Sequence, residues 1–361
     1  MKYVCFTILF FAAGAHAQLK TENLIIITTD GFRWQEVFGG MDSAIANDPQ
    51  FNQGDSVYIF KKYWDTDDAG RRKKLLPFFW NTIAEKGQIY GNRKLGSKVD
   101  NANPYWFSYP GYNEIMTGFA DTAINSNSYP ANPNITVLEF LSKQPKLKGK
   151  MAAFGAWDAF DRILNEERSG IPVHSAFDTY GGTKPNSNEQ LLNKMLADSY
   201  KPWLEEECPD IFTHYGAMEY LKTKKPNVMY IAYGETDEWA HAGQYRSYLD
   251  AANQVDKWIG QLWDFIQSNP AYKNKTTLFI TTDHGRGDIN KNEWRDHGSS
   301  IQGANEIWCA VIGPDIDAKG EIKQGMQYYQ KQFAQTFARL MGYDFKTDHP
   351  VAEEIEMIFV K

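Results

Sequence analysis

The sequence predicts an α/β fold with a mostly parallel central sheet and helices on both of its faces. Short apolar runs alternate along the chain with amphipathic stretches of helical length. Several of these runs are apolar at almost every position, as strands are when both faces of a sheet are covered. Because no internal repeat and no Pro/Ser-rich linker divides the 361 residues, we expect one domain.

The predicted elements follow from hydrophobic spacing. Five short runs are expected to be strands: 24–28, 151–154, 228–232, 277–281 and 307–312. Six stretches are expected to be helices: 76–86, 136–143, 188–198, 211–222, 245–267 and 328–340. The segment 41–74 is polar and interrupts this rhythm between the first strand and its helix, so we expect a surface insertion that forms a rim or lid.

The first 17 residues have the pattern of a cleaved export signal. A short n-region is followed by an apolar run over 4–13, and residues 15–17 read Ala-His-Ala. We therefore expect a mature chain over 18–361 that is periplasmic or secreted. No later stretch approaches the ~20 apolar residues that a transmembrane helix needs.

Charge and cysteine content exclude further classes of protein. The formal net charge is -7 and no long basic run is present, which argues against binding a nucleic-acid polymer. Only Cys208 and Cys309 follow the signal, too few for a disulfide scaffold, although one bridge stays open.

Polar side chains follow three of the predicted strands. Asp30 comes after the first strand, Asp237 and His241 after the third, and Asp283 and His284 after the fourth. Ligands of open α/β sheets bind beyond the carboxyl ends of strands, so we expect these side chains to converge. An adjacent Asp and His buried at a strand end without an ion would be costly.

His297, just before the last predicted strand, is a sixth candidate ligand. Three Asp and three His suit two ions of zinc or a similar first-row divalent metal, whereas calcium and magnesium sites rarely use His. The other mature histidines, His174, His214 and His349, are assigned surface or structural positions.

Ser108 is the candidate nucleophile. It precedes a short predicted helix that ends at Gly118, and both the helix dipole and a nearby metal would lower the pKa of its hydroxyl. A simple helix-capping serine would have the same local sequence.

Taken in order, these motifs (Asp-Gly, Ser-x-Pro, Asp-x-x-x-His, Asp-His-Gly and His-Gly) resemble the alkaline phosphatase superfamily, most closely its type I phosphodiesterase/nucleotide pyrophosphatase branch. The resemblance implies an alkaline-phosphatase-like core and a hydrolase of phosphoric esters with two zinc ions. It implies one zinc site of Asp237, His241 and His297 and a second of Asp30, Asp283 and His284. Ser108 would face the second site and form a covalent phospho-serine.

The resemblance also implies contacts to the substrate. Asn127 is the match to the family asparagine that holds a phosphoryl oxygen, with Asn125 as an alternative. Trp157, Tyr109 and Tyr112 are expected to line the substrate pocket.

One departure from the family bears on the substrate. Monoesterase relatives carry Lys and Arg where this chain has 154–160, which holds no cation. The missing clamp favours a phosphodiester over a dianionic monoester, although Arg162 or Arg168 could replace it.

Four alternatives stay open: a phosphomonoesterase, a phosphonate hydrolase, a sulfate ester hydrolase, and a secreted binding protein without turnover. The sulfatase motif Cys/Ser-x-Pro-x-Arg is not met, because Tyr112 stands where the arginine would be. The expected substrate is a small-molecule, glycan or lipid phosphate ester, selected by the loops 41–74, 101–107 and 177–186. The sequence does not predict an oligomeric state.

Overall fold

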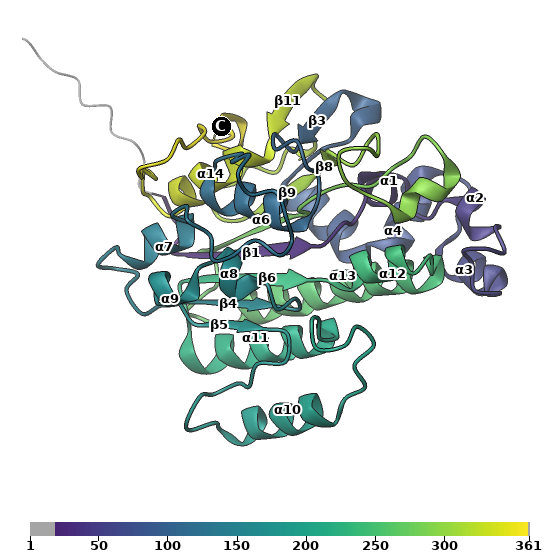
Figure 1. Ribbon diagram of the computed structural model, residues 1–361. Coiled ribbons are helices and arrows are strands. Elements are labelled where there is room, and N and C mark those ends of the chain that lie inside the picture. The colour runs from purple at the N-terminus through teal and green to yellow at the C-terminus, as the bar shows by residue number, and fades with distance from the viewer. Residues whose placement is uncertain (1–18, 360–361) are drawn as a thin grey trace, which may run out of the picture.

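A computed structural model of the chain describes residues 19–359, so the predicted export signal over 1–17 lies outside the described residues. Its main feature is an eight-stranded sheet with the order β10-β2-β9-β7-β1-β6-β4-β5 (Figure 1). The strands are β1 Asn23–Thr29, β2 Gln88–Tyr90, β4 Met151–Gly155, β5 Val173–Ser175, β6 Val228–Tyr233, β7 Thr276–Thr281, β9 Cys309–Ile312 and β10 Gly320–Glu321.

The sheet is mostly parallel, as predicted. β1 pairs in parallel with β6 on one side and with β7 on the other, and β4 continues the parallel order beyond β6. Only β9 runs antiparallel, against both β7 and β2. The carboxyl ends of β1, β6 and β7 therefore share one edge of the sheet.

A second sheet of three short strands lies beside the first: β11 Met326–Tyr329, β3 Ser97–Asp100 and β8 Glu306–Ile307. It corrects two predictions. The strand predicted over 307–312 is divided at Trp308 between β8 and β9, which belong to different sheets. The helix predicted over 328–340 begins only at Phe333, because its first residues pair with β3.

Helices cover both faces of the main sheet (Figure 1). Along β1, Ile25 and Ile27 join a core shared with two helices, α11 Asp210–Lys224 and α13 Tyr245–Ser268. Leu24 and Ile26 join a separate core with α6 Ser108–Thr117, α7 Val137–Ser142 and α14 Phe333–Leu340. The α-helices are α1 Trp34–Gly39, α2 Ser43–Ala46, α3 Ser56–Tyr63, α4 Asp68–Leu75, α5 Ala84–Lys86, α6 Ser108–Thr117, α7 Val137–Ser142, α8 Phe160–Ile163, α9 Glu166–Ser169, α10 Ser187–Asp198, α11 Asp210–Lys224, α12 Glu235–His241, α13 Tyr245–Ser268 and α14 Phe333–Leu340.

The helix predicted over 76–86 is a π-helix, η1 Phe79–Ile83, that continues into α5. The buried carboxylate of Asp256 on α13 accepts hydrogen bonds from the backbone N–H groups of Phe78 and Phe79, at 2.8 and 2.9 Å. One acidic side chain thus caps this segment from the helix beneath it. The short 3-10 helices are η2 Arg93–Leu95, η3 Lys291–Arg295, η4 Gln330–Gln332 and η5 Glu356–Ile358.

The polar segment 41–74 forms the three helices α2, α3 and α4. Its apolar residues Ile45, Phe51 and Ile59 are each at most 3% exposed and pack into the core that α13 also lines. The segment is therefore anchored by buried side chains while its charged residues face outward.

Cys208 and Cys309 are both buried and free, so the open disulfide does not form. Among residues 19–359, no helix is both long and apolar enough to cross a membrane.

Candidate metal centre

The predicted metal ligands gather at the edge where β1, β6 and β7 end. Asp30 follows β1 directly, and Asp283 and His284 follow β7. The chain after β6 enters α12, which carries Asp237 and His241 one helical turn apart and so on the same side.

Asp30, Asp283 and His284 form one candidate ion site. Each offers a ligand atom within 4.8 Å of the other two, and all three are buried. His284 Nε2 lies 3.3 Å from Asp30 Oδ1 and 3.4 Å from Asp283 Oδ2. The resemblance assigned this same trio to the second zinc.

His297 reaches the edge from the loop after η3 and, with Asp237 and His284, forms a second candidate site within the same limit. His241 extends this site, since its Nε2 lies 2.9 Å from His297 Nε2 and 3.1 Å from Asp237 Oδ2. His284 belongs to both groups, with its Nε2 3.7 Å from Asp237 Oδ1. The two ligand sets, which the sequence analysis assigned to separate ions, therefore lie next to each other and share His284.

Unpartnered atoms indicate that these residues fit a cation. Asp30 Oδ1, Asp283 Oδ2 and His297 Nδ1 are buried and have no hydrogen-bond partner among the described residues. Burial, and next to it the charge of Asp237, raises the pKa of Asp30 well above its usual range. Burial and then Asp30 do the same to the pKa of Asp283. Divalent ions would supply the missing partners, and mixed carboxylate and imidazole ligands suit zinc.

Arg286, which the sequence analysis did not single out, is a further charged member of the site. Its guanidinium contacts Asp237 Oδ1, and its Nε donates to the carbonyl of Gly31 at 3.1 Å. Burial opposes the ionisation of Asp237, but Arg286 and then His241 hold the pKa of Asp237 well below its usual range. Gly31 has φ +55°, and a Cβ there would lie 2.5 Å from Asp237 Oδ1, so only glycine permits this packing. Sequence reasoning could have found Arg286 from its position directly after the Asp-His-Gly motif.

Ser108 is the first residue of α6, and its Oγ lies 3.4 Å from His284 Nε2. The capping position belongs to Phe107, so the serine hydroxyl is free of that role. At Gly111, one turn along, a Cβ would lie 2.4 Å from the carbonyl oxygen of Asp283. Glycine at this position lets the start of α6 approach the metal ligands closely.

The loop before Ser108 is held by a buried carboxylate. Glu114 accepts hydrogen bonds from the backbone N–H groups of Ala102, Asn103 and Lys331, each at 2.8 Å. Trp106, two residues before Ser108, has a left-handed φ of 54°. Strain of this kind persists where the surroundings enforce it and is common at active sites.

Asn127 lies at the start of the same helix. Its Oδ1 accepts a hydrogen bond from the backbone N–H of Tyr109 at 3.0 Å, which leaves its Nδ2 to donate elsewhere. Asn127, rather than Asn125, is thus bonded to the turn that carries Ser108. Arg162 Nη2 lies 3.5 Å from the carbonyl oxygen of Asn127, so one of the two alternative cations is near this turn.

Tyr109 and Tyr112 do not line open space. Their side chains are 0% and 1% exposed. The Tyr109 hydroxyl donates to the carbonyl of Pro130 at 2.7 Å, and the Tyr112 hydroxyl donates to Asp30 Oδ2 at 2.8 Å. Every residue of α6 is buried and both hydroxyls are bonded inside the protein, so the structure corrects the predicted role of these tyrosines as pocket walls. Tyr112 instead orients a candidate metal ligand.

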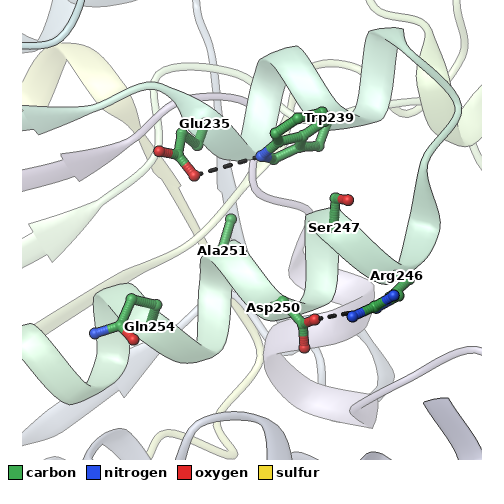
Figure 2. A pocket seen from close by; sticks show the side chains of 7 residues that line it. All are labelled: Glu235, Trp239, Arg246, Ser247, Asp250, Ala251 and Gln254. Carbon is green, nitrogen blue, oxygen red and sulfur yellow. Dashed lines mark hydrogen bonds and ion pairs between the residues drawn. The ribbon is translucent and has the colours of Figure 1, made fainter. Parts of the chain in front are cut away.

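Trp157 is half-buried and lines a cavity of about 240 Å³ beside the metal centre. The other lining residues are Trp203, Leu204, Glu206, Glu207 and Glu238. A larger hollow of about 470 Å³ lies between α12 and α13 (Figure 2), where Trp239 faces Glu235. Trp239 packs edge-on against Trp203, with ring centroids 5.2 Å apart, so the two hollows are neighbours.

Residues 42–307 match the sequence model of the family described as type I phosphodiesterase / nucleotide pyrophosphatase. A 2,3-bisphosphoglycerate-independent phosphoglycerate mutase of Haloarcula marismortui is 23% identical over 230 residues, which are 63% of this chain and 40% of that protein. The chain thus spans well under half the length of this curated relative.

Two solved structures share the fold. A phosphonate monoester hydrolase from Silicibacter pomeroyi has a TM-score of 0.57 at 13% identity, over 94% of this chain and 76% of that one. A protein in the alkaline phosphatase superfamily from Vibrio parahaemolyticus has a TM-score of 0.53 at 14% identity, over 93% of this chain and 71% of that one. The predicted α/β fold of the alkaline phosphatase type is thereby confirmed.

Proposed function

The chain belongs to the type I phosphodiesterase/nucleotide pyrophosphatase family, and we propose that it is a two-metal hydrolase of phosphoric esters that acts on diesters. The observation that carries the proposal is the unpartnered, buried ligand atoms of Asp30, Asp283 and His297, next to a serine hydroxyl at a helix start.

Two zinc ions fit the ligands at this edge of the sheet. Asp237, His241 and His297 would hold one, and His284 Nε2 lies 3.7 Å from the Asp237 carboxylate. Asp30 and Asp283 with His284 would hold the other. When bound, such ions lower the pKa of hydroxyl and water groups and offset the charge that develops on the phosphoryl group.

Ser108 Oγ is the nucleophile in this proposal. Attack on phosphorus forms an Oγ–P bond while the bond from phosphorus to the leaving oxygen breaks in line. Water then cleaves the phospho-serine and returns the serine hydroxyl. Asn127 would donate its Nδ2 to a phosphoryl oxygen, and its Oδ1, which accepts a hydrogen bond from the Tyr109 N–H, supports this role.

The proposed preference for a diester depends on whether a cationic side chain can reach the phosphoryl group. Arg168 donates to the carbonyl oxygens of Asn132 and Asn134, at 2.9 and 2.7 Å, and to Glu139, so it is committed elsewhere. Arg162 is 37% exposed in its side chain and close to Asn127. That position favours phosphomonoester hydrolysis as a second candidate function, because a swing of Arg162 toward the phosphoryl group would supply the dianion clamp.

We also propose that the enzyme acts outside the cytoplasm on a small-molecule, glycan or lipid ester. The export pattern of residues 1–17 supports the location.

The test measures zinc per chain and the turnover of bis(p-nitrophenyl) phosphate against p-nitrophenyl phosphate. We expect two zincs, faster diester turnover, and loss of at least ~1000-fold in kcat for Ser108→Ala with zinc retained. Ser142→Ala, which removes a hydroxyl bonded to the Glu139 carbonyl on α7, is the matched control and keeps full activity. A chain without zinc that cleaves neither ester refutes the proposal, and equal or faster monoester turnover that falls in Arg162→Ala favours the second candidate.

A further inference from the structure

Arg286 is a buried cation that lies among the candidate metal ligands. The residue is 1% exposed and follows His284 by two positions in the loop after β7. The ligands come from four segments of the chain: Asp30 after β1, Asp237 and His241 on α12, Asp283 and His284 after β7, and His297 after η3. Arg286 belongs to the third of these segments, and its guanidinium contacts the other three.

The hydrogen bonds of Arg286 define these contacts. Its Nε donates to the carbonyl oxygen of Gly31, the residue after the first ligand, at 3.1 Å. Its Nη2 donates to the carbonyl oxygen of Asp237 at 3.2 Å and also contacts Oδ1 of that residue. Its Nη1 donates to the carbonyl oxygen of Arg295, two residues before the last ligand, at 2.5 Å. One planar guanidinium therefore joins all four ligand-bearing segments in a fixed relation.

The contact with Asp237 also decides which of its two oxygens is free for an ion. Arg286 contacts Oδ1, whereas Oδ2 lies 3.1 Å from His241 Nε2. His297 Nε2 lies 2.9 Å from the same imidazole nitrogen. Arg286 thus holds the carboxylate with Oδ2 toward His241, where this oxygen can act as a ligand beside the two histidines.

A second buried arginine supports the loop that carries Arg286. Arg33, in the segment after β1, is 1% exposed, and its Nη1 donates to the carbonyl oxygen of Gly287 at 3.1 Å. The carboxylate of Glu36, which is 0% exposed, balances its charge and accepts from its Nε at 2.8 Å. The loops after β1 and β7 therefore brace each other, because Arg33 reaches Gly287 and Arg286 reaches Gly31.

Arg286 has two effects of opposite sign on a bound cation. Its positive charge repels a divalent ion at the neighbouring ligands and so lowers the affinity of the site. Its hydrogen bonds hold the ligand-bearing segments in place, which raises the affinity. Among residues 19–359, its one ion pair is with the candidate ligand Asp237. Removal of the side chain therefore shows which effect dominates.

We propose that Arg286 is a positioning residue that fixes the four ligand-bearing segments relative to one another before the ions bind, and that Arg33 supports it through Gly287. The proposal rests on the two-metal function proposed above and adds the side chain on which zinc affinity depends. Because Arg286 contacts ligands and backbone groups, its effect on turnover passes through zinc binding.

The first experiment measures zinc binding at one pH, by competition with a chelating dye, in protein freed of metal by a chelator. Arg286→Gln removes the charge, and Arg286→Lys keeps the charge but loses the planar fork. We expect both variants to bind zinc about 10- to 100-fold more weakly than the wild type. Repulsion alone predicts tighter binding in Arg286→Gln and no change in Arg286→Lys. Tighter or unchanged binding in either variant overturns the proposal.

Two further variants control for effects on the fold. Arg72→Gln removes an arginine that is paired with Glu321 and lies over the Trp80 ring, and it should bind zinc as the wild type does. Arg33→Lys keeps the charge beside Glu36 but not the fork, so it should weaken zinc binding about threefold or more. Unchanged zinc affinity in Arg33→Lys overturns the supporting role of Arg33. Thermal melting of the zinc-free proteins checks that each variant is folded, and Arg286→Lys decides the test if Arg286→Gln is not.

The zinc dependence of turnover separates positioning from a direct role in the reaction. With bis(p-nitrophenyl) phosphate, Arg286→Lys should approach the wild-type kcat once free zinc is raised about 10- to 100-fold. A loss of kcat that persists at saturating zinc, with wild-type zinc affinity, overturns the proposal. A wild type that binds two zinc ions but cleaves no diester refutes the phosphodiesterase function, while weaker zinc binding by the Arg286 variants leaves the positioning role standing.

Discussion

Replacing Asp283 by Asn removes one buried charge at the metal centre while keeping the shape of the side chain. Asp283 Oδ1 accepts a hydrogen bond from the Gly31 N–H at 3.0 Å, and an asparagine oxygen can do the same. Asp283 Oδ2 has no partner and lies 3.4 Å from His284 Nε2. We therefore expect the zinc-free variant to be at least as stable as zinc-free wild type, because a neutral amide costs less to bury than a carboxylate.

The expected magnitude follows from the coupling of zinc binding to folding. Free zinc at ~1000 times Kd stabilises the folded chain by about 4 kcal/mol. Unfolding entropy for a chain of 361 residues is roughly 0.76 kcal/mol per kelvin, so the wild type should gain about 5 °C in Tm. Asp283→Asn should gain less than about 2 °C, because the variant loses a charged ligand of one ion.

The assay is scanning calorimetry of chelator-treated protein with and without added zinc. Asp55→Asn, which removes a carboxylate paired with Arg246 on the surface, is the control and should keep the full zinc shift. An unchanged zinc shift in Asp283→Asn would refute the assignment of Asp283 as a ligand. A zinc-free variant several degrees less stable than zinc-free wild type would show instead that the ionised carboxylate is structural.

Three other variants test neighbouring parts of the argument. Tyr112→Phe removes the hydrogen bond to Asp30 and should weaken zinc binding about 10- to 100-fold with the fold unchanged, which competition with a chelating dye measures. Burial raises the pKa of Asp256 to about 7, so its carboxyl binds a proton more tightly in the folded than in the unfolded chain. The free energy of unfolding should therefore fall by at most about 4 kcal/mol between pH ~4 and ~7, and denaturant titrations should show this slope removed in Asp256→Asn. Glu114→Ala leaves the N–H groups of the loop before Ser108 unpaired, and denaturant titration should show a loss of about 3 kcal/mol or more.

Local sequence patterns were sufficient to predict the long strands and helices. β1, β6 and β7 are buried on both faces, so they read as continuous apolar runs, and α13 carries one long apolar stripe. Strands of two to four residues, such as β3 and β8, carry too few positions for a periodic signal. For the same reason the change of sheet at Trp308 and the pairing of β11 with β3 were not predicted.

Motifs that follow a strand predicted five of the six candidate ligands, because neighbouring parallel strands end at the same edge. The sixth, His297, lies in the loop after η3. What sequence order could not predict is which face of α6 meets that edge. Ser108 and Tyr112 are one turn apart, and both hydroxyls lie against candidate metal ligands, His284 and Asp30. The hydroxyl of Tyr109 instead donates to the carbonyl of Pro130, away from these ligands.

By itself, the sequence determined the long strands of the sheet, the long helices that cover it and the six candidate ligand positions, since these depend on hydrophobic period and on the order of short polar motifs. Only the tertiary structure decided that Arg286 contacts Asp237 and that the backbone of Glu207 pairs with those of Trp157 and Trp203. Contacts between residues about 50 positions apart, such as Trp157 and Glu207, depend on how loops pack over the sheet. Local propensity carries no information about that packing, because it is set by the shapes and charges of distant surfaces.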